Sequence, residues 1–243
     1  MDLYHVDFKY EPHSSHKTLD DVSVFIPYGH TTAIVGESGS GKTTLLKLLL
    51  GYYPVSNGEL SIGGTNINRL NKKWWRRQCS VVMQDGVIFS DTIARNIAVG
   101  DGDVDMDRVK VAARVACIED YIVTLPLGYD TKIGRDGVGL SQGQKQRILI
   151  ARAFYKDSCY VFLDGATNSL DTFNERMIVE NLHSFYEHRT VVVVAHRLST
   201  VRHAHQIIVM NKGRIVEVGK HEELVKLRGY YYNLLRQQIE IGT

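Results

Sequence analysis

Hydrophobic and polar positions change their period along the chain, and each period predicts a different kind of element. Residues 3–10 alternate, with Tyr4, Val6, Phe8 and Tyr10 on one side, as in a half-buried strand with an aromatic face. Between residues 86 and 156 the apolar spacing is mainly helical, over 92–97, 105–117, 119–124 and 145–155. Short apolar runs predict further strands at 22–26, 31–35, 59–62, 80–83, 159–164 and 190–195. The pattern predicts an α/β core with a helical lobe inserted between its strands.

Two glycine-containing pairs predict turns on either side of the strand at 59–62. Asn57-Gly58 predicts a turn before it, and Gly63-Gly64 predicts a tight hairpin turn after it. Together with the alternating strand near the N-terminus, these turns predict an antiparallel sheet beside the core.

Charge, cysteine spacing and the length of apolar runs limit the partners and the cellular compartment that we expect for this protein. The net charge is +2, from 29 basic and 27 acidic residues, so no strong field attracts anionic lipid, and no nucleic-acid partner is expected. Cys79, Cys117 and Cys159 have no C-x-x-C spacing and lie among apolar residues, which predicts reduced, core-facing thiols in a cytosolic compartment. Every apolar run is much shorter than the roughly 18–20 residues that span a bilayer, so no part of this sequence is expected to cross a membrane.

The stretch from Gly36 to Thr44 carries the most specific chemistry. It follows the predicted strand at 31–35 and precedes a run of helix formers at 45–50, which Gly51 closes. Its glycines predict a loop whose amides point at phosphate oxygens, beside the positive end of a helix. The side chains predicted to reach the β- and γ-phosphates and Mg²⁺ are Lys42 and Thr43, respectively. The predicted triphosphate-binding residues are Gly36, Glu37, Ser38, Gly39, Ser40, Gly41, Lys42, Thr43 and Thr44.

Two other segments each have two interpretations. Tyr10 offers a ring face to an adenine base, although a core or hairpin aromatic is the commoner role for such a residue. Ser141 followed by Gln144 is a capping box at the start of the helix predicted for 145–155. The same helix N-terminus would also suit a second phosphate group, and the two roles are compatible.

Two predicted strands lead into residues that suit a ligand site. The strand at 159–164 ends in Asp164, and an aspartate in this place helps to hold Mg²⁺ in P-loop enzymes. The strand at 190–195 is followed by His196. Because ligands gather at the carboxyl ends of parallel strands, both side chains are candidates for the nucleotide site.

These motifs, in this order, resemble the nucleotide-binding domain of an ATP-binding cassette (ABC) transporter. The matching residues are Tyr10, the loop 36–44, Gln84, the signature Leu140-Ser141-Gln142-Gly143-Gln144, the strand ending in Asp164, the segment 169–171 and His196. Segments 89–97, 134–137 and 219–238 resemble the exporter type, and 166–171 loosely resembles peptide exporters.

The resemblance implies a fold and a division of the chain. The fold is α/β, a P-loop NTPase (RecA-like) core with an antiparallel β subdomain and an inserted α-helical subdomain. Residues 1–85 and 157–243 would form the ATP-binding core with the β subdomain, and residues 86–156 the helical signature subdomain. Exporter cassettes are commonly fused behind membrane helices, so we expect an excised domain of a longer polypeptide, with a separate subunit as the alternative.

The resemblance also implies roles. Tyr10 would stack on adenine, Gln84 would contact Mg²⁺ or water, and His196 would contact the γ-phosphate and the attacking water. The signature residues that would close over ATP held by a second copy, in a head-to-tail dimer, are Ser141, Gly143 and Gln144. The implied Mg²⁺ ligands are Thr43, Gln84 and Asp164. The implied activity is ATP hydrolysis that drives export, at the cytoplasmic face of a membrane, together with transmembrane domains.

Gly165 departs from the family pattern, which places a glutamate directly after the strand-ending aspartate to orient or deprotonate the attacking water. Glycine supplies no acceptor at this catalytic position. General-base help is worth about 10²–10⁴ in rate, so we predict strongly impaired hydrolysis with ATP binding preserved. The other motifs are intact, which favours a single lesion in an otherwise active domain over a degenerate site.

Other functions fit the sequence less well. A soluble ABC ATPase of DNA repair or translation usually carries long coiled-coil insertions or paired cassettes, and this sequence has neither. A small-molecule kinase would leave the signature and His196 unexplained. Gly165 keeps open a non-catalytic interaction module that is gated by ATP.

Overall fold

The computed structural model describes residues 1–100, 102–166, 172–195 and 201–241. The chain forms two compact units, one made of Met1–Cys79 and His188–Thr243 and the other of Ser80–Glu187. The resemblance assigns residues 86–156 to a helical signature subdomain and the rest of the chain to the ATP-binding core. This functional division stays a prediction.

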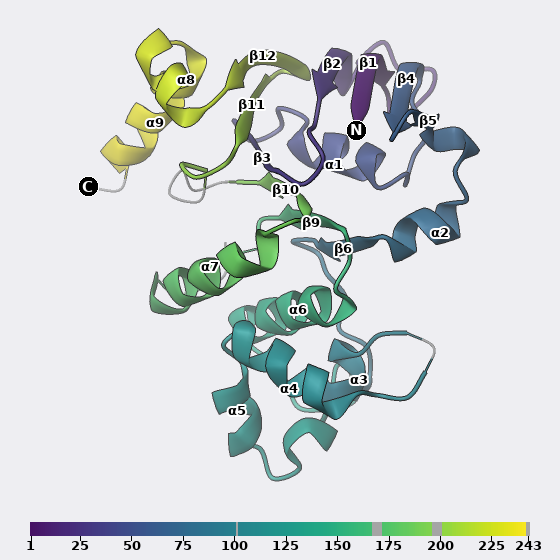
Figure 1. Ribbon diagram of the computed structural model, residues 1–243, viewed down its shortest axis with the longest axis vertical. Helices are drawn as coiled ribbons and strands as arrows, with labels where there is room; N and C mark the ends of the chain where they lie inside the picture. The colour runs from purple at the N-terminus through teal and green to yellow at the C-terminus, as the bar shows by residue number, and fades with distance from the viewer. Residues whose placement is uncertain (101, 167–171, 196–200, 242–243) are drawn as a thin grey trace. The chain divides into compact units, whose positions relative to one another are not determined.

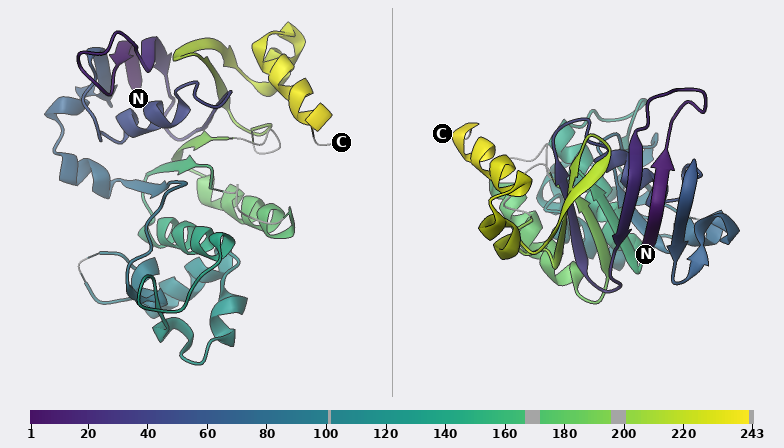
Figure 2. Two further views of the ribbon diagram at one scale, coloured as in Figure 1. Left: turned by 180° about the vertical axis from the view of Figure 1, so that it is seen from behind. Right: turned by 90° about the horizontal axis from the view of Figure 1, so that it is seen from above.

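An antiparallel sheet in the first unit has the strand order β2-β1-β4-β5 (Figures 1 and 2). Its strands are β1 (Asp2–Phe8), β2 (Leu19–Phe25), β4 (Asn57–Ile62) and β5 (Thr65–Asn66). The predicted single aromatic face of β1 is wrong at Tyr4, which is exposed while its neighbour Leu3 is buried. The cause is an irregular register between Leu3 and Val6, where His5 has φ 47° and the alternation shifts by one residue. The predicted antiparallel sheet is confirmed.

The two glycine pairs have different roles in this sheet. Gly63-Gly64 joins β4 to β5 with both φ angles positive, 55° and 77°, which confirms the predicted hairpin turn. Asn57-Gly58 is not a turn, because both residues belong to β4. Gly58 lies where the register of β1 and β4 shifts, and a Cβ there would collide with the His5 carbonyl oxygen. Close backbone approach at a bulge therefore explains this glycine.

The second sheet of this unit positions the predicted nucleotide loop. Its neighbouring strands are β12 (Arg214–Gly219), β11 (Gln206–Asn211), β3 (Thr31–Gly36) and β10 (Thr190–Val194), in that order. β3 is central and pairs in parallel with β10 and β11, whereas β11 and β12 are antiparallel. Two parallel partners explain why Ala33, Ile34 and Val35 form a continuously buried run.

Helices of the first unit follow these strands. α1 (Lys42–Leu49) comes directly after the predicted nucleotide loop, and Gly51 lies just beyond its end with φ 68°. A short 3₁₀ turn, η1 (Ile67–Arg69), and α2 (Lys72–Arg77) follow β5. The chain ends in α8 (His221–Leu227) and α9 (Tyr230–Ile241), which are yellow in Figure 1.

The second unit is mostly helical. Its helical elements are α3 (Ile93–Ile97), α4 (Met106–Val115), α5 (Glu119–Thr124), η2 (Gly128–Asp130), α6 (Gln142–Lys156) and α7 (Thr172–Tyr186). Its strands are β6 (Cys79–Val82), which neighbours β9 (Tyr160–Asp164), and the pair β7 (Asp91–Thr92) and β8 (Lys132–Ile133). Thr92 and Asp105 are N-caps, so the predicted helices begin one residue later than their patterns do.

The cysteines are less uniform than the sequence predicts. Cys79 is buried and Cys117 is half-buried, but Cys159, just before β9, is exposed. The prediction of a core-facing thiol is therefore wrong for Cys159. Within the described residues, no helix combines the length and the apolar character that a membrane span requires.

Asn96 is the centre of a buried hydrogen-bond network in the second unit. Its side chain is fully buried, accepts the Phe89 N–H (2.8 Å) and donates to the carbonyl oxygens of Phe89 (2.9 Å) and Thr92 (3.1 Å). Arg152 donates to the Asn96 carbonyl oxygen (2.8 Å), and burial lowers the pKa of Arg152 to about 10. This network fixes the segment before α3 against α6.

We expect Asn96→Ala to destabilise the chain by about 2–4 kcal/mol, because buried backbone groups lose their partners while Arg152 stays in place. Urea unfolding followed by circular dichroism measures the loss. Asn68→Ala, at an exposed residue of η1, is the matched control and should change stability by less than about 0.5 kcal/mol. Equal losses in the two variants would contradict the role of the network.

Candidate nucleotide-binding site

The loop between β3 and α1 depends on glycines. φ is 78° at Gly39 and 103° at Gly41, angles that residues with a Cβ rarely adopt. A Cβ on Gly36 would collide with the Met210 carbonyl oxygen of β11, and one on Gly41 would lie 2.8 Å from Leu19 Cδ2. The geometry of the loop therefore requires glycine at positions that the sequence motif marks.

Lys42 lies against this loop with its side chain only 5% exposed. Its Nζ donates to the carbonyl oxygens of Gly36 (2.9 Å) and Glu37 (2.7 Å). Because an ammonium group is costly to bury without partners, these carbonyls stabilise its charge within the loop. Thr43, the next residue, is half-buried in the first turn of α1.

Ser40 shows that the loop suits an anionic ligand. Its side chain is 3% exposed, and its Oγ has no hydrogen-bond partner among the described residues. A buried hydroxyl without a partner costs about 1–3 kcal/mol, and a phosphate oxygen would accept its hydrogen bond. The hydroxyl of Ser40, the charge of Lys42 and the start of α1 therefore fit a triphosphate.

Tyr10 lies two residues beyond the end of β1 and is 48% exposed. Its ring makes edge-to-face contacts with Phe8 (centroids 4.9 Å apart) and Tyr53 (5.4 Å). Its Oη lies 3.1 Å from Oγ1 of Thr44, so a hydrogen bond ties this aromatic cluster to the first turn of α1. A ring exposed to this extent is not a core residue, and its stacking on adenine stays a prediction.

Asp164 and Gly165 belong to the second unit. Asp164 is the last residue of β9 and is 2% exposed. Gly165 follows with φ 61°, in the left-handed region, where an L-residue costs roughly 1–2 kcal/mol. Gly165 thus lacks the carboxylate of the expected glutamate, and its backbone angle is also one that glutamate adopts poorly. Sequence reasoning identified the missing carboxylate but could not find this backbone conformation.

The signature segment begins α6 with the predicted capping box. Ser141 Oγ accepts the Gln144 N–H (3.2 Å), and the Gln144 side-chain oxygen accepts the Ser141 N–H (2.8 Å). Ser141 is exposed, and Gly143 and Gln144 are half-buried. The capping interpretation is therefore confirmed, while phosphate binding by this helix N-terminus stays a prediction.

The predicted site residues divide between the described units as follows. In the first unit, Tyr10 contacts Thr44, the last residue of the loop 36–44. The second unit holds Gln84, which is exposed, together with Asp164, Gly165 and the signature. His196 and the segment 169–171 lie outside the described residues.

Sequence reasoning missed an ion-pair network in the first unit. Lys17 Nζ lies 2.9 Å from Asp7 Oδ2 and 2.8 Å from Asp20 Oδ1, and Arg214 of β12 also pairs with Asp20. The hydrogen bonds from Lys17 are the largest cause of a lowered pKa at both carboxyl groups, Asp7 and Asp20. Lys17 and Asp20 are three residues apart, but Arg214 is almost 200 residues away from them, so no local pattern reveals the complete network.

The glycine-rich loop between a central parallel strand and a helix, with a buried lysine, defines a P-loop nucleotide-binding domain. The family described as ABC transporter matches residues 19–168. The chain belongs to the ABC transporter family, which confirms the resemblance and the fold class inferred from the motifs.

Proteins similar to this chain include a flippase, a toxin translocation protein and an ABC exporter. An ATP-dependent lipid A-core flippase of Legionella pneumophila is 44% identical over 236 residues, which cover 96% of this chain and 40% of that protein. The toxin RTX-III translocation ATP-binding protein of Actinobacillus pleuropneumoniae is 44% identical over 235 residues, covering 96% of this chain and 33% of that protein. A bacterial Atm1-family ABC exporter with ATP bound matches with a TM-score of 0.92 and 37% identity, over 98% of this chain and 41% of its own. This chain thus spans at most about two-fifths of these three proteins.

Proposed function

We propose that this chain is the ATP-binding motor domain of an ABC exporter. The observation that carries the proposal is the structure of the loop 36–44. In this loop the buried Lys42 donates hydrogen bonds to two carbonyl oxygens, and the Ser40 hydroxyl has no hydrogen-bond partner among the described residues. This loop suits the triphosphate of ATP. The names of the similar proteins, a flippase, a toxin translocation protein and an exporter, support a role in export.

ATP would be held chiefly by the nucleotide loop of the first unit. The amides of the loop and Lys42 would bind the phosphates, and the ring of Tyr10 would stack on adenine. The candidate Mg²⁺ ligands are Thr43, Gln84 and Asp164. When bound, Mg²⁺ neutralises charge on the β- and γ-phosphates.

A second copy of the chain would complete each nucleotide site. Ser141 is exposed at the start of α6, and the first turn of this helix carries amides that the helix itself does not satisfy. In a head-to-tail dimer, Ser141, Gly143 and Gln144 of one copy would close over ATP bound to the other. Transmembrane domains of the same longer polypeptide would place this dimer at the cytoplasmic face of a membrane.

Hydrolysis by this chain is proposed to be strongly impaired. Gly165 has no side chain to orient or deprotonate water. The same observation favours a second candidate function, a non-catalytic module in which ATP binding alone controls an interaction.

Size-exclusion chromatography with and without Mg²⁺-ATP, with phosphate release measured on the same samples, tests the proposal. We expect a monomer that becomes a stable dimer with ATP and releases very little phosphate. Rapid release would show that another group replaces the glutamate. A chain that stays monomeric with ATP would contradict the closing role of Ser141.

A further inference from the structure

The C-terminal helix α9 is held firmly at its first residues. The Glu217 carboxylate, on β12, accepts the backbone N–H groups of Tyr230 and Tyr231, the latter at 2.9 Å. A carboxylate at this place satisfies helix amides and complements the helix dipole. A Cβ on Gly229 would collide with that carboxylate, so the preceding glycine permits the close approach. Both tyrosines are therefore presented by a fixed helix end.

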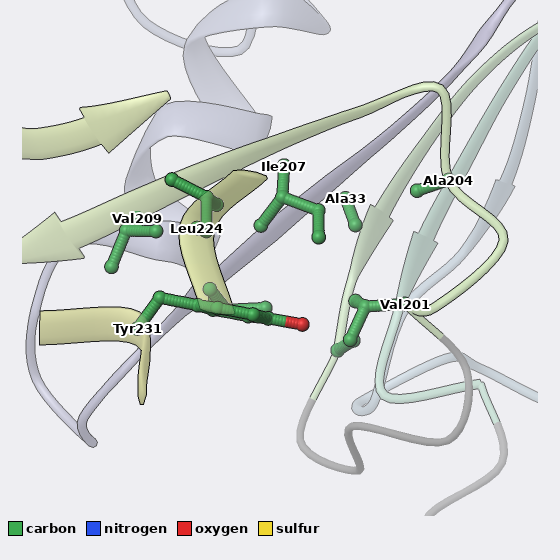
Figure 3. Close-up of a cluster of buried hydrophobic side chains, with 9 residues drawn as sticks. Ala33, Val201, Ala204, Ile207, Val209, Leu224 and Tyr231 are labelled. Carbon is green, nitrogen blue, oxygen red and sulfur yellow. The ribbon is translucent and has the colours of Figure 1, made fainter. Parts of the chain in front are cut away.

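Tyr231 anchors α9 in the core of the first unit. Its side chain is fully buried in a cluster with Val201, Ile207 and Leu224, and its ring extends from α9 toward Val201 (Figure 3). Its hydroxyl lies 2.8 Å from Nδ1 of His221, the first residue of α8.

Tyr230 extends from the same helix end to the nucleotide loop. Its hydroxyl faces the Glu37 carboxyl group, and both residues line one pocket of about 350 Å³. Burial chiefly, and then this carboxyl group, raise the pKa of Tyr230, so the hydroxyl stays protonated and can donate. The remaining lining residues come from the next turns of α9: Asn233, Leu234, Arg236 and Gln237.

A contact to the Glu37 side chain can affect the shape of the nucleotide loop, because the backbone of Glu37 holds two other residues of this loop. Its carbonyl oxygen accepts Lys42 Nζ (2.7 Å) and the Ser40 N–H (3.2 Å). The orientation of one peptide group thus affects both the lysine and the turn of the loop that are predicted to bind phosphate. A contact that restrains the Glu37 side chain also restrains this peptide group.

We propose that Tyr230 is a positioning residue for the nucleotide loop, and that α9 holds the loop in its phosphate-binding shape through Glu37. Tyr230 itself would not touch ATP. The inference rests on the proposed function, because it concerns the affinity of the loop for ATP.

The test is a double-mutant cycle measured on ATP affinity. Binding of a fluorescent ATP analogue with Mg²⁺ is titrated for the wild-type chain, Tyr230→Phe, Glu37→Gln and the double variant. Tyr230→Phe removes one hydroxyl and should raise the Kd roughly 3- to 10-fold, the range for one net hydrogen bond. In the Glu37→Gln background the same substitution should have a much smaller effect, because its charged partner is gone.

Tyr232→Phe, the same change two residues along α9, is the matched control and should leave the Kd unchanged. Thermal unfolding should be nearly the same for all variants, which separates positioning from a general loss of structure. A wild-type Kd for Tyr230→Phe, or an equal loss with and without the Glu37 carboxylate, would overturn the inference. If the wild-type chain binds no ATP analogue, the proposed function itself fails, which is a distinct result.

Discussion

Replacing Gly165 by glutamate is expected to raise ATP hydrolysis by about 10²–10⁴-fold, the typical contribution of a positioned general base. The carboxylate would follow directly after Asp164, at the position where the family pattern places it. ATP affinity should change little, because the loop 36–44 is untouched. Steady-state phosphate release at saturating Mg²⁺-ATP measures the gain.

Gly165→Gln is the matched control for this experiment. Glutamine has nearly the same size, and it meets the same left-handed backbone at φ 61°, but it has no carboxylate. Both variants should lose about 1–2 kcal/mol of stability through backbone strain, and only the glutamate variant should gain hydrolysis. Equal rates in the two variants would show that a carboxylate is not what the site lacks. In that case the ATP-gated module becomes the better account.

The fold could be predicted wherever one period persists. The run 31–35 is apolar throughout because β3 has parallel partners on both sides, and that pattern is clear in the sequence. The prediction failed at β1 and at Asn57-Gly58, where the strands carry irregular registers. A bulge is decided by two strands together, so the sequence of one strand does not reveal it.

The candidate site could also be predicted only where its residues are neighbours in the sequence. A continuous motif revealed the nucleotide loop, because strand, loop and helix are neighbours in the chain. The contact between Glu37 and Tyr230 joins residues that are far apart in the sequence, and neither residue type indicates it. The left-handed angle of Gly165 was also hidden, since a glycine in a sequence does not state its φ.

Replacing Lys42 by alanine is expected to weaken ATP binding by at least about 30-fold. Removing one member of a buried, hydrogen-bonded charge pair costs roughly 2–5 kcal/mol, which corresponds to about 30- to 4,000-fold in affinity. Lys42 is 5% exposed within the loop, so water would screen its charge poorly. Titration of the fluorescent ATP analogue, with thermal unfolding as a check on folding, measures the effect.

Lys47→Ala provides the comparison, because Lys47 lies in the last turn of the same helix and is half-exposed. Both variants replace a lysine of α1 by alanine, a good helix former. They therefore differ only in which end of the helix loses an ammonium group. If the affinity depends on the ammonium held by Gly36 and Glu37, Lys47→Ala should bind ATP within about twofold of the wild type, less than one ordinary hydrogen bond contributes. Similar affinities for the two variants would mean that this lysine does not bind the phosphates, and the proposed ATP site would have to be abandoned.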